Sequence, residues 1–131
     1  MEKMEKNHKH MIINAHVRHP IVTAESCENW LRKLVEIIDM KILIEPVAKF
    51  CDTEGNEGVT GTVVIETSHA SIHVWHKAER PYIRMDVYSC KDFSEESVVN
   101  FVRETMDVVS GGYLMVDRNK ESPVLTQSAI I

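Results

Sequence analysis

The segment from residue 60 to residue 90 alternates between apolar and chemically reactive side chains, and this alternation is the strongest constraint on the fold. Successive side chains of a β-strand point to opposite faces. The apolar positions of its two clearest strands are Ala70, Ile72, Val74, Ile83, Met85 and Val87. The polar positions are His69, Ser71, His73, Trp75, Tyr82, Arg84, Asp86, Tyr88 and Cys90. If the two strands are neighbours, His73 and Cys90 face the same space.

Composition limits the class of protein. The chain has 131 residues and a formal net charge of −5, so we expect a single domain, residues 1–131, and no nucleic-acid partner, because acidic and basic residues are intermixed. Three cysteines at wide spacing, without a CxxC pair, indicate neither a disulfide framework nor a zinc ribbon. The chain contains no apolar run long enough for a membrane helix and no signal-peptide pattern. We expect a soluble, cytoplasmic protein whose partner is a small molecule or a protein, with no membrane association.

The order of predicted elements gives the fold class. A helix is expected after Thr23, and a second helix starts near Ser94 and ends at Gly111 and Gly112. Strands are expected at residues 10–17, 41–47, 60–67, 69–76, 81–89 and 112–118. Residues 1–9 and about 120–131 have no assignable structure and are expected to be flexible. This order predicts an α+β fold, a two-layer sandwich in which two helices cover one face of a mostly antiparallel sheet.

The second face of the predicted sheet carries several aromatic residues, among them Trp75, Tyr82 and Tyr88. This is more aromatic surface than is usually left in water. We therefore expect a homodimer that stacks two sheets face to face, in the layer order helix, sheet, sheet, helix. An active site on this face would lie at or near the subunit interface.

Three motifs together resemble one family. They are SHASIHVW at residues 68–75, the strand that begins GVTG at residues 58–65, and MDVYSC at residues 85–90. The combination is similar to the prokaryotic-type, pyruvoyl-dependent S-adenosylmethionine decarboxylases. Members of this family are made as zymogens that cut their own chain at a serine, and they act in polyamine (spermidine) biosynthesis.

The resemblance implies a role for each matching residue. Ser68 would attack the carbonyl of Thr67, and autocatalytic cleavage between Thr67 and Ser68 would turn Ser68 into a pyruvoyl cofactor. That group would form a Schiff base with the amine of S-adenosylmethionine and act as the electron sink for decarboxylation. His73 would be the base for self-cleavage and Cys90 the proton donor after carbon dioxide leaves. Thr60 stands where the family has a serine that assists processing.

The sequence also departs from the family pattern. Thr67 replaces the glutamate before the cleaved bond, and Lys91 replaces the glycine that follows the cysteine. Lys77 replaces the glutamate that holds the ribose hydroxyls of the substrate, and a lysine offers no acceptor. Glu79 could take over this contact if the turn folds back, and Trp75 is a second candidate for substrate binding or interface packing.

Other readings remain open. An unprocessed homologue with the same fold could have lost its activity or could act on another amino acid, or the chain could be a regulatory dimer that binds a protein. Outside the family context, Ser68 is typical of a turn, His73 of a structural histidine and Cys90 of a buried thiol. No metal is expected, because the histidines near the start of the chain lack a second ligand pair or a carboxylate at matching spacing. These histidines are His8, His10, His16 and His19.

Overall fold

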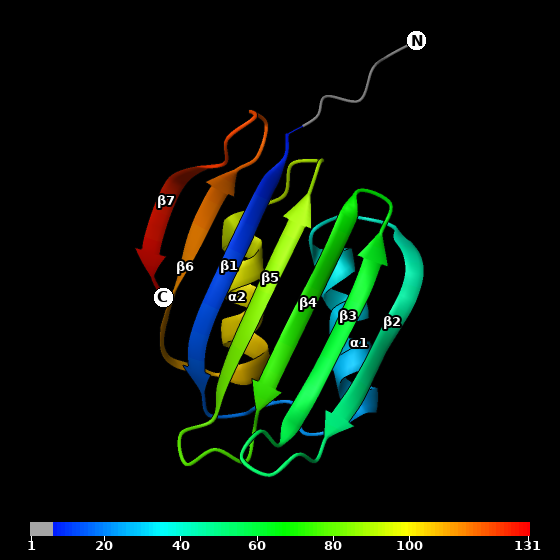
Figure 1. Cartoon of the computed structure of the whole chain (residues 1–131), viewed down its shortest axis with the longest axis vertical. Helices are drawn as coiled ribbons and strands as arrows, with labels where there is room; N and C mark the ends of the chain where they lie inside the picture. The colour runs from blue at the N-terminus through cyan, green and yellow to red at the C-terminus, as the bar shows by residue number, and fades with distance from the viewer. Residues whose placement is uncertain (1–6) are drawn as a thin grey trace.

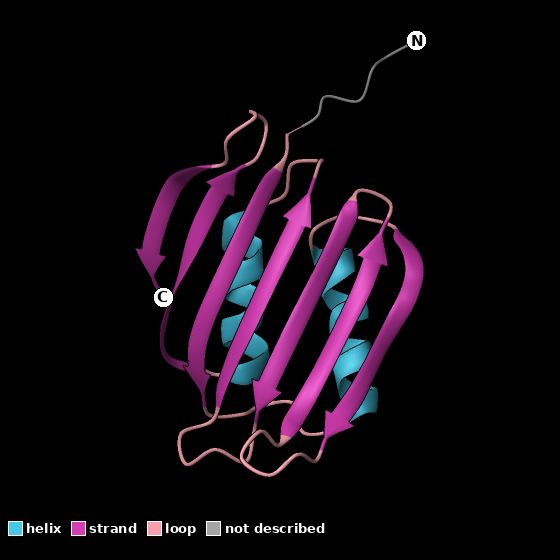
Figure 2. Cartoon of the chain, in the orientation of Figure 1, coloured by secondary structure: helices cyan, strands magenta, loops and turns pink. Residues whose placement is uncertain are grey.

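A computed structural model describes residues 7–131 and arranges them in two layers (Figure 1). The strands are β1 (Lys9–Val17), β2 (Ile42–Cys51), β3 (Gly58–Ile65), β4 (Ser68–Trp75), β5 (Tyr82–Ser89), β6 (Val108–Asp117) and β7 (Val124–Ile130). They form one antiparallel sheet in the order β2-β3-β4-β5-β1-β6-β7. The helices α1 (Ala24–Ile37) and α2 (Glu95–Met106) lie on the same face of this sheet (Figure 2). The predicted α+β sandwich is confirmed.

Both helices begin where the sequence supplies a cap. The Thr23 hydroxyl accepts a hydrogen bond from the Ser26 amide at the start of α1, and the Ser94 hydroxyl accepts one from the Ser97 amide at the start of α2. Such side chains satisfy amide groups that lack a partner within the helix. Each helix buries an apolar stripe against the sheet, which includes Leu34 in α1 and Val102 in α2. Neither helix of the described chain is long and apolar enough to cross a membrane.

The alternation in β4 and β5 places their side chains as predicted. The apolar residues of both strands pack against the helices, and each is at most 4% exposed. The polar residues at the intervening positions lie on the opposite face, which we call the open face because no helix covers it (Figure 2). Burial of the apolar set removes it from water and fixes which side of each strand faces outward.

The end of α2 differs from the prediction. The helix stops at Met106, and Asp107 adopts a left-handed conformation with φ of 54° that ends the helical hydrogen bonding. Gly111 and Gly112, which were expected to end the helix, lie inside β6. A Cβ atom on Gly111 would clash with the Asn14 carbonyl oxygen in β1. The glycine therefore permits the close approach of two strands rather than a helix end.

The two ends of the chain also differ from the prediction. Residues 124–130, expected to be flexible, form β7 and pair with β6. At the other end, β1 begins at Lys9, so part of the segment predicted as flexible belongs to the sheet. The remainder of that prediction, residues 1–6, lies outside the described residues.

Candidate functional site

Ser68 is the first residue of β4, directly after a tight turn at Glu66 and Thr67. The register of the sheet pairs Ser68 with Ser89, the last residue of β5. The next residue, Cys90, therefore lies beside the turn, and its amide donates a hydrogen bond of 3.0 Å to the Thr67 carbonyl oxygen. The carbonyl that precedes Ser68 is thus polarised by a backbone donor, and the adjacent hydroxyl is that of Ser68, the residue predicted to be the nucleophile.

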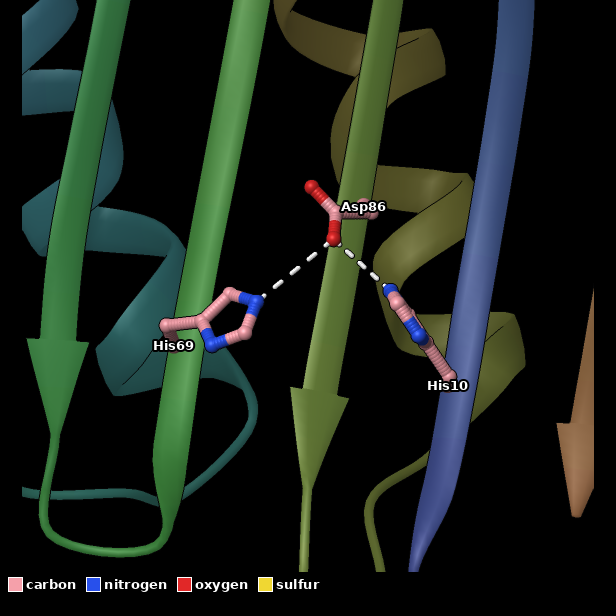
Figure 3. A group of neighbouring side chains, drawn as sticks. All are labelled: His10, His69 and Asp86. Atoms are coloured by element: carbon pink, nitrogen blue, oxygen red, sulfur yellow. Dashed lines mark hydrogen bonds and ion pairs between the residues drawn. The ribbon is translucent and has the colours of Figure 1, made fainter. Parts of the chain in front are cut away.

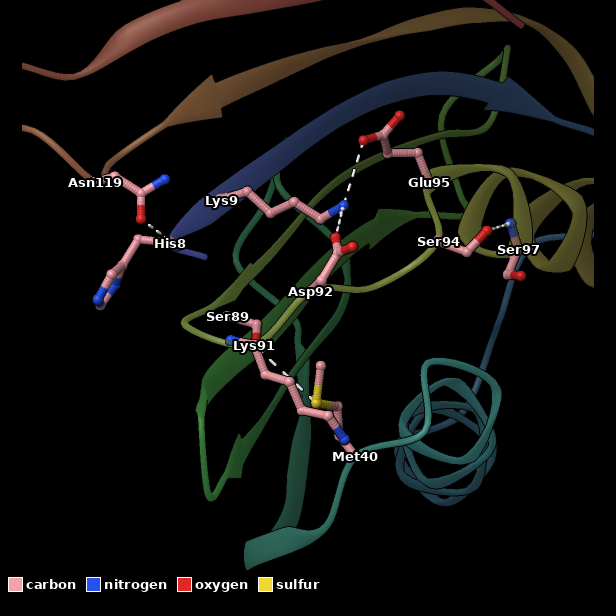
Figure 4. A network of polar contacts seen from close by, with 10 residues as sticks. All are labelled: His8, Lys9, Met40, Ser89, Lys91, Asp92, Ser94, Glu95, Ser97 and Asn119. Carbon is pink, nitrogen blue, oxygen red and sulfur yellow. Dashed lines mark hydrogen bonds and ion pairs between the residues drawn. The ribbon is translucent and has the colours of Figure 1, made fainter. Parts of the chain in front are cut away.

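The Thr67 side chain points away from the open face into a polar contact at the edge of the core. Its hydroxyl accepts a hydrogen bond of 3.0 Å from Ser89 and donates one of 3.3 Å to the Met40 sulfur. Ser89 is fully buried, and its hydroxyl also accepts a hydrogen bond of 3.0 Å from the Lys91 amide (Figure 4). These contacts hold the Thr67 side of the Thr67–Ser68 bond.

His73 and Thr60 form a second group on the open face. The register pairs them across β3 and β4, and Thr60 Oγ1 lies 3.0 Å from His73 Nδ1. The His73 ring stacks on Trp75 at a centroid distance of 5.9 Å. Trp75 also stacks on Tyr82, at 4.7 Å, and donates a hydrogen bond of 2.7 Å to the Asn56 side chain. The imidazole is therefore oriented by a hydroxyl and by an aromatic face.

The two groups do not meet within one chain. Cys90 follows the residue opposite Ser68, whereas His73 is opposite Arg84 in the same pair of strands. His73 lies five positions after Ser68 in β4, which corresponds to about 17 Å along the strand. The prediction that His73 and Cys90 face the same space is wrong for the single chain. The polar face was predicted correctly, but the face alone does not say where along it a residue lies.

The candidate substrate contacts are also separated. Trp75 lines a small hollow together with Lys77 and a residue that the sequence reasoning missed, Glu57, which comes from the loop after β2. Glu79 lines a different hollow, beside the end of β1. The carboxylate that lines the same hollow as Trp75 and Lys77 is therefore Glu57. Glu79, the carboxylate expected there from the sequence, lies elsewhere.

A third group, also missed, brings together His10, His69 and Asp86 from β1, β4 and β5 (Figure 3). Asp86 Oδ2 lies 2.7 Å from His10 Nε2 and 3.6 Å from His69 Nε2. Burial raises the pKa of the Asp86 carboxyl, but the hydrogen bond and positive charge of His10, together with His69, outweigh burial and hold this pKa below its usual value. His10 had been set aside as lacking a carboxylate partner, and the sheet supplies one.

Comparison with known proteins places the chain in a family. The model of the S-adenosylmethionine decarboxylase family matches residues 9–119, and the chain belongs to this family. It is 32% identical over 77 residues to the S-adenosylmethionine decarboxylase proenzyme of Clostridium botulinum (strain Langeland), a match that covers 58% of this chain and 61% of that protein. The match thus spans less than two thirds of that relative.

Two further similarities were found. The S-adenosylmethionine decarboxylase proenzyme of Archaeoglobus fulgidus is 30% identical over 92 residues, which cover 70% of this chain and 80% of that protein. Among solved structures, a phage SAM lyase in complex with S-methyl-5'-thioadenosine is similar, with 12% sequence identity and a TM-score of 0.47. The match covers 100% of this chain and 94% of the lyase chain.

The charge of Asp86 should contribute to stability in a pH-dependent way. Because its pKa is lowered in the folded chain, the contribution is complete above the unfolded value of about 3.9 and is lost as the pH falls through the folded value. We expect Asp86→Asn to lower the free energy of unfolding in urea at neutral pH and to have little effect well below that value. Asp52→Asn, in the exposed loop after β2, is the control. An equal loss at both pH values would contradict the expectation.

Proposed function

We propose that this chain is a self-processing decarboxylase that acts on S-adenosylmethionine through a pyruvoyl group made from Ser68, in the synthesis of polyamines. The observation that carries the proposal is the hydrogen bond from the Cys90 amide to the Thr67 carbonyl oxygen, directly beside Ser68. Membership of the decarboxylase family supports the same activity. A backbone donor aimed at a carbonyl stabilises the negative charge that develops when a nucleophile attacks it.

Self-cleavage then follows in two stages. Ser68 Oγ bonds to the Thr67 carbonyl carbon, the peptide C–N bond breaks, and the released nitrogen takes up the proton, which leaves an ester. A base next removes the α-proton of Ser68, and the carboxylate of Thr67 departs as the C–O bond breaks. The remaining enamine becomes an imine, and water replaces its nitrogen, which leaves as ammonia. The new chain begins with a pyruvoyl group at position 68.

If His73 is the base for self-cleavage, it must act on the Ser68 of another chain. A general base acts within hydrogen-bonding reach of the proton that it removes, and His73 lies about 17 Å along β4 from Ser68. In a face-to-face dimer, a two-fold axis that lies between the two sheets and runs across the strands exchanges the ends of β4. Such an axis sets the Ser68 end of one chain opposite the His73 end of the other, with stacked sheets about 10 Å apart.

The open face has the surface that such a dimer requires. Besides its aromatic side chains, it exposes four apolar residues at 39–57% of their surface. These are Ile12, Ile44, Val47 and Leu114. Burial of these side chains against a second sheet would favour association. The proposal therefore places two composite sites in one symmetric homodimer.

Decarboxylation uses the same site after cleavage. The pyruvoyl carbonyl supplies an electron sink when carbon dioxide is lost. The Cys90 side chain, one residue past the register partner of Ser68, would donate a proton after carbon dioxide leaves. The stacked rings of Trp75 and Tyr82 offer a flat surface for a nucleobase, and Glu57 supplies beside them a carboxylate for ribose hydroxyls, which Lys77 cannot.

The first test is the mass of the purified chain. We expect the wild-type protein to separate into fragments of residues 1–67 and 68–131 and Ser68→Ala to stay intact. Ser71→Ala is the matched control, because Ser71 is the other serine of β4 and should leave cleavage unchanged. A wild-type chain that remains at full length after prolonged incubation would refute the pyruvoyl mechanism.

Hybrid dimers test the composite site. Ser68→Ala and His73→Ala chains should each remain uncut alone, but a mixture refolded together should cut the His73→Ala chain, because its Ser68 then faces an intact His73. Mass spectrometry distinguishes the two chains. As a control, Ser68→Ala is mixed with the double variant Ser68→Ala/His73→Ala, which offers no Ser68 to cut. Absence of cleavage in the first mixture, with mixed dimers formed, would rule out this arrangement.

The two roles proposed for Cys90 can be separated, because one uses the backbone and the other uses the side chain. Cys90→Ala keeps the amide that donates to Thr67, so cleavage should proceed. It removes the thiol, so the release of labelled carbon dioxide from S-adenosylmethionine should fall by about 10²- to 10⁴-fold, the usual contribution of a general acid. Unchanged carbon dioxide release from the cleaved variant would assign the proton transfer to another group.

A further inference from the structure

We propose that His10, His69 and Asp86 form a binding site for a divalent transition-metal ion such as Zn²⁺ on the open face of the sheet (Figure 3). The donors are two imidazole nitrogens and one carboxylate oxygen. Mg²⁺ and Ca²⁺ prefer oxygen ligands, whereas two histidines and one carboxylate form a typical zinc ligand set that leaves a further position for water.

The sheet itself holds the three donors in place. His10 in β1 and His69 in β4 are both register partners of Tyr88 in the strand between them. Asp86 is two residues from Tyr88, so its side chain emerges from the same face between the two histidines. All three backbone positions are fixed by ladder hydrogen bonds in the interior of the sheet. A metal site built on strands in this way needs little backbone rearrangement to bind an ion.

The distances are close to those that a metal ion imposes. Bonds of about 2.0–2.2 Å to each donor in a tetrahedral site place the donors roughly 3.3–3.6 Å apart. Asp86 Oδ2 lies 3.6 Å from His69 Nε2 and 2.7 Å from His10 Nε2, and all the donor atoms lie within 4.8 Å of one another. A small rotation of the carboxylate away from His10, with the two imidazoles moving closer, therefore completes the site.

Two charges near this cluster have opposite effects on the binding of a cation. The carboxylate of Asp86 lies between the two imidazoles and attracts a cation. Arg118 opposes it: a guanidinium nitrogen lies 3.4 Å from His10 Nδ1, and the guanidinium carbon lies 4.1 Å from the centroid of the Tyr88 ring. When Nε2 binds a metal, Nδ1 carries the proton, and arginine has no acceptor for it. Arg118 is exposed and follows the end of β6, so its side chain can move into solvent when an ion binds.

Titration with zinc and cobalt tests the proposal. We use the Ser68→Ala chain, which keeps all three ligands in an intact chain and makes the result independent of the proposed cleavage. Calorimetry with Zn²⁺ should give one ion per chain, and Co²⁺ should bind at the same stoichiometry with the visible absorption of a site of low coordination number. His69→Ala and Asp86→Asn should each weaken binding by more than about 100-fold, since even the loss of an outer-shell partner costs 10- to 100-fold.

Two further variants make the test specific. His19→Ala is the matched control, because His19 Nε2 also lies near a carboxylate, 3.9 Å from Asp107 Oδ2, in a pair that lacks a second histidine. It should leave zinc affinity unchanged. Arg118→Gln removes the competing charge and supplies an acceptor for His10 Nδ1, so it should tighten binding by about two- to fivefold. Misfolding cannot explain a variant that binds zinc more tightly than the parent chain.

Three outcomes would overturn the proposal. One is the absence of stoichiometric binding of either metal to the parent chain. Another is binding that persists unchanged in folded His69→Ala and Asp86→Asn chains, which would place the ion elsewhere. The third is equal weakening by His19→Ala, which would indicate non-specific binding to surface histidines.

Discussion

The register of β4 against β5 is the constraint on which the candidate site depends. Pairing of Ser68 with Ser89 brings the Cys90 amide to the Thr67 carbonyl, and the same ladder sets His73 opposite Arg84, far from that end. A slip of one residue would turn every polar side chain of β4 toward the helices. The completely buried residues Ala70 and Ile72 oppose such a slip, because their apolar surface would then face water.

The sequence could predict faces but not positions along them. Alternation in β4 and β5 specified the polar face correctly, since burial imposes a period of two. Register depends on the length of the turn at Glu66 and Thr67 and on contacts between distant segments, and neither leaves a local pattern. His10 and Asp86 are 76 positions apart in the chain, so no spacing within a motif could have indicated that they meet. β7 was missed for a related reason: its side chains are nearly all exposed, so no burial pattern reveals the strand.

The distance between the group around Ser68 and the group around His73 gives the proposed dimer a second role. A second sheet was first expected in order to cover aromatic surface on the open face. If His73 is the base, its distance of about 17 Å along β4 from Ser68 gives a second reason, because a base at that distance can act on Ser68 only from another chain. In the proposed dimer, the axis that runs across the strands would keep β4 opposite β4, so this one strand would supply complementary halves of both sites. Association of the two chains would then cover the open face and complete the site at the same time.

The replacement of glutamate by Thr67 can be understood from the space that this side chain occupies. Its hydroxyl lies between Ser89, which has no exposed surface, and the Met40 sulfur. A carboxylate directed into the same space would lose its hydration next to a thioether, at a cost that one hydroxyl donor does not offset. Thr67 and Ser89 therefore form a matched pair of hydroxyl groups. Because this pair holds the side chain on the helix side of the sheet, the Thr67 carbonyl stays directed at the Cys90 amide, which is the orientation that the proposed attack by Ser68 requires.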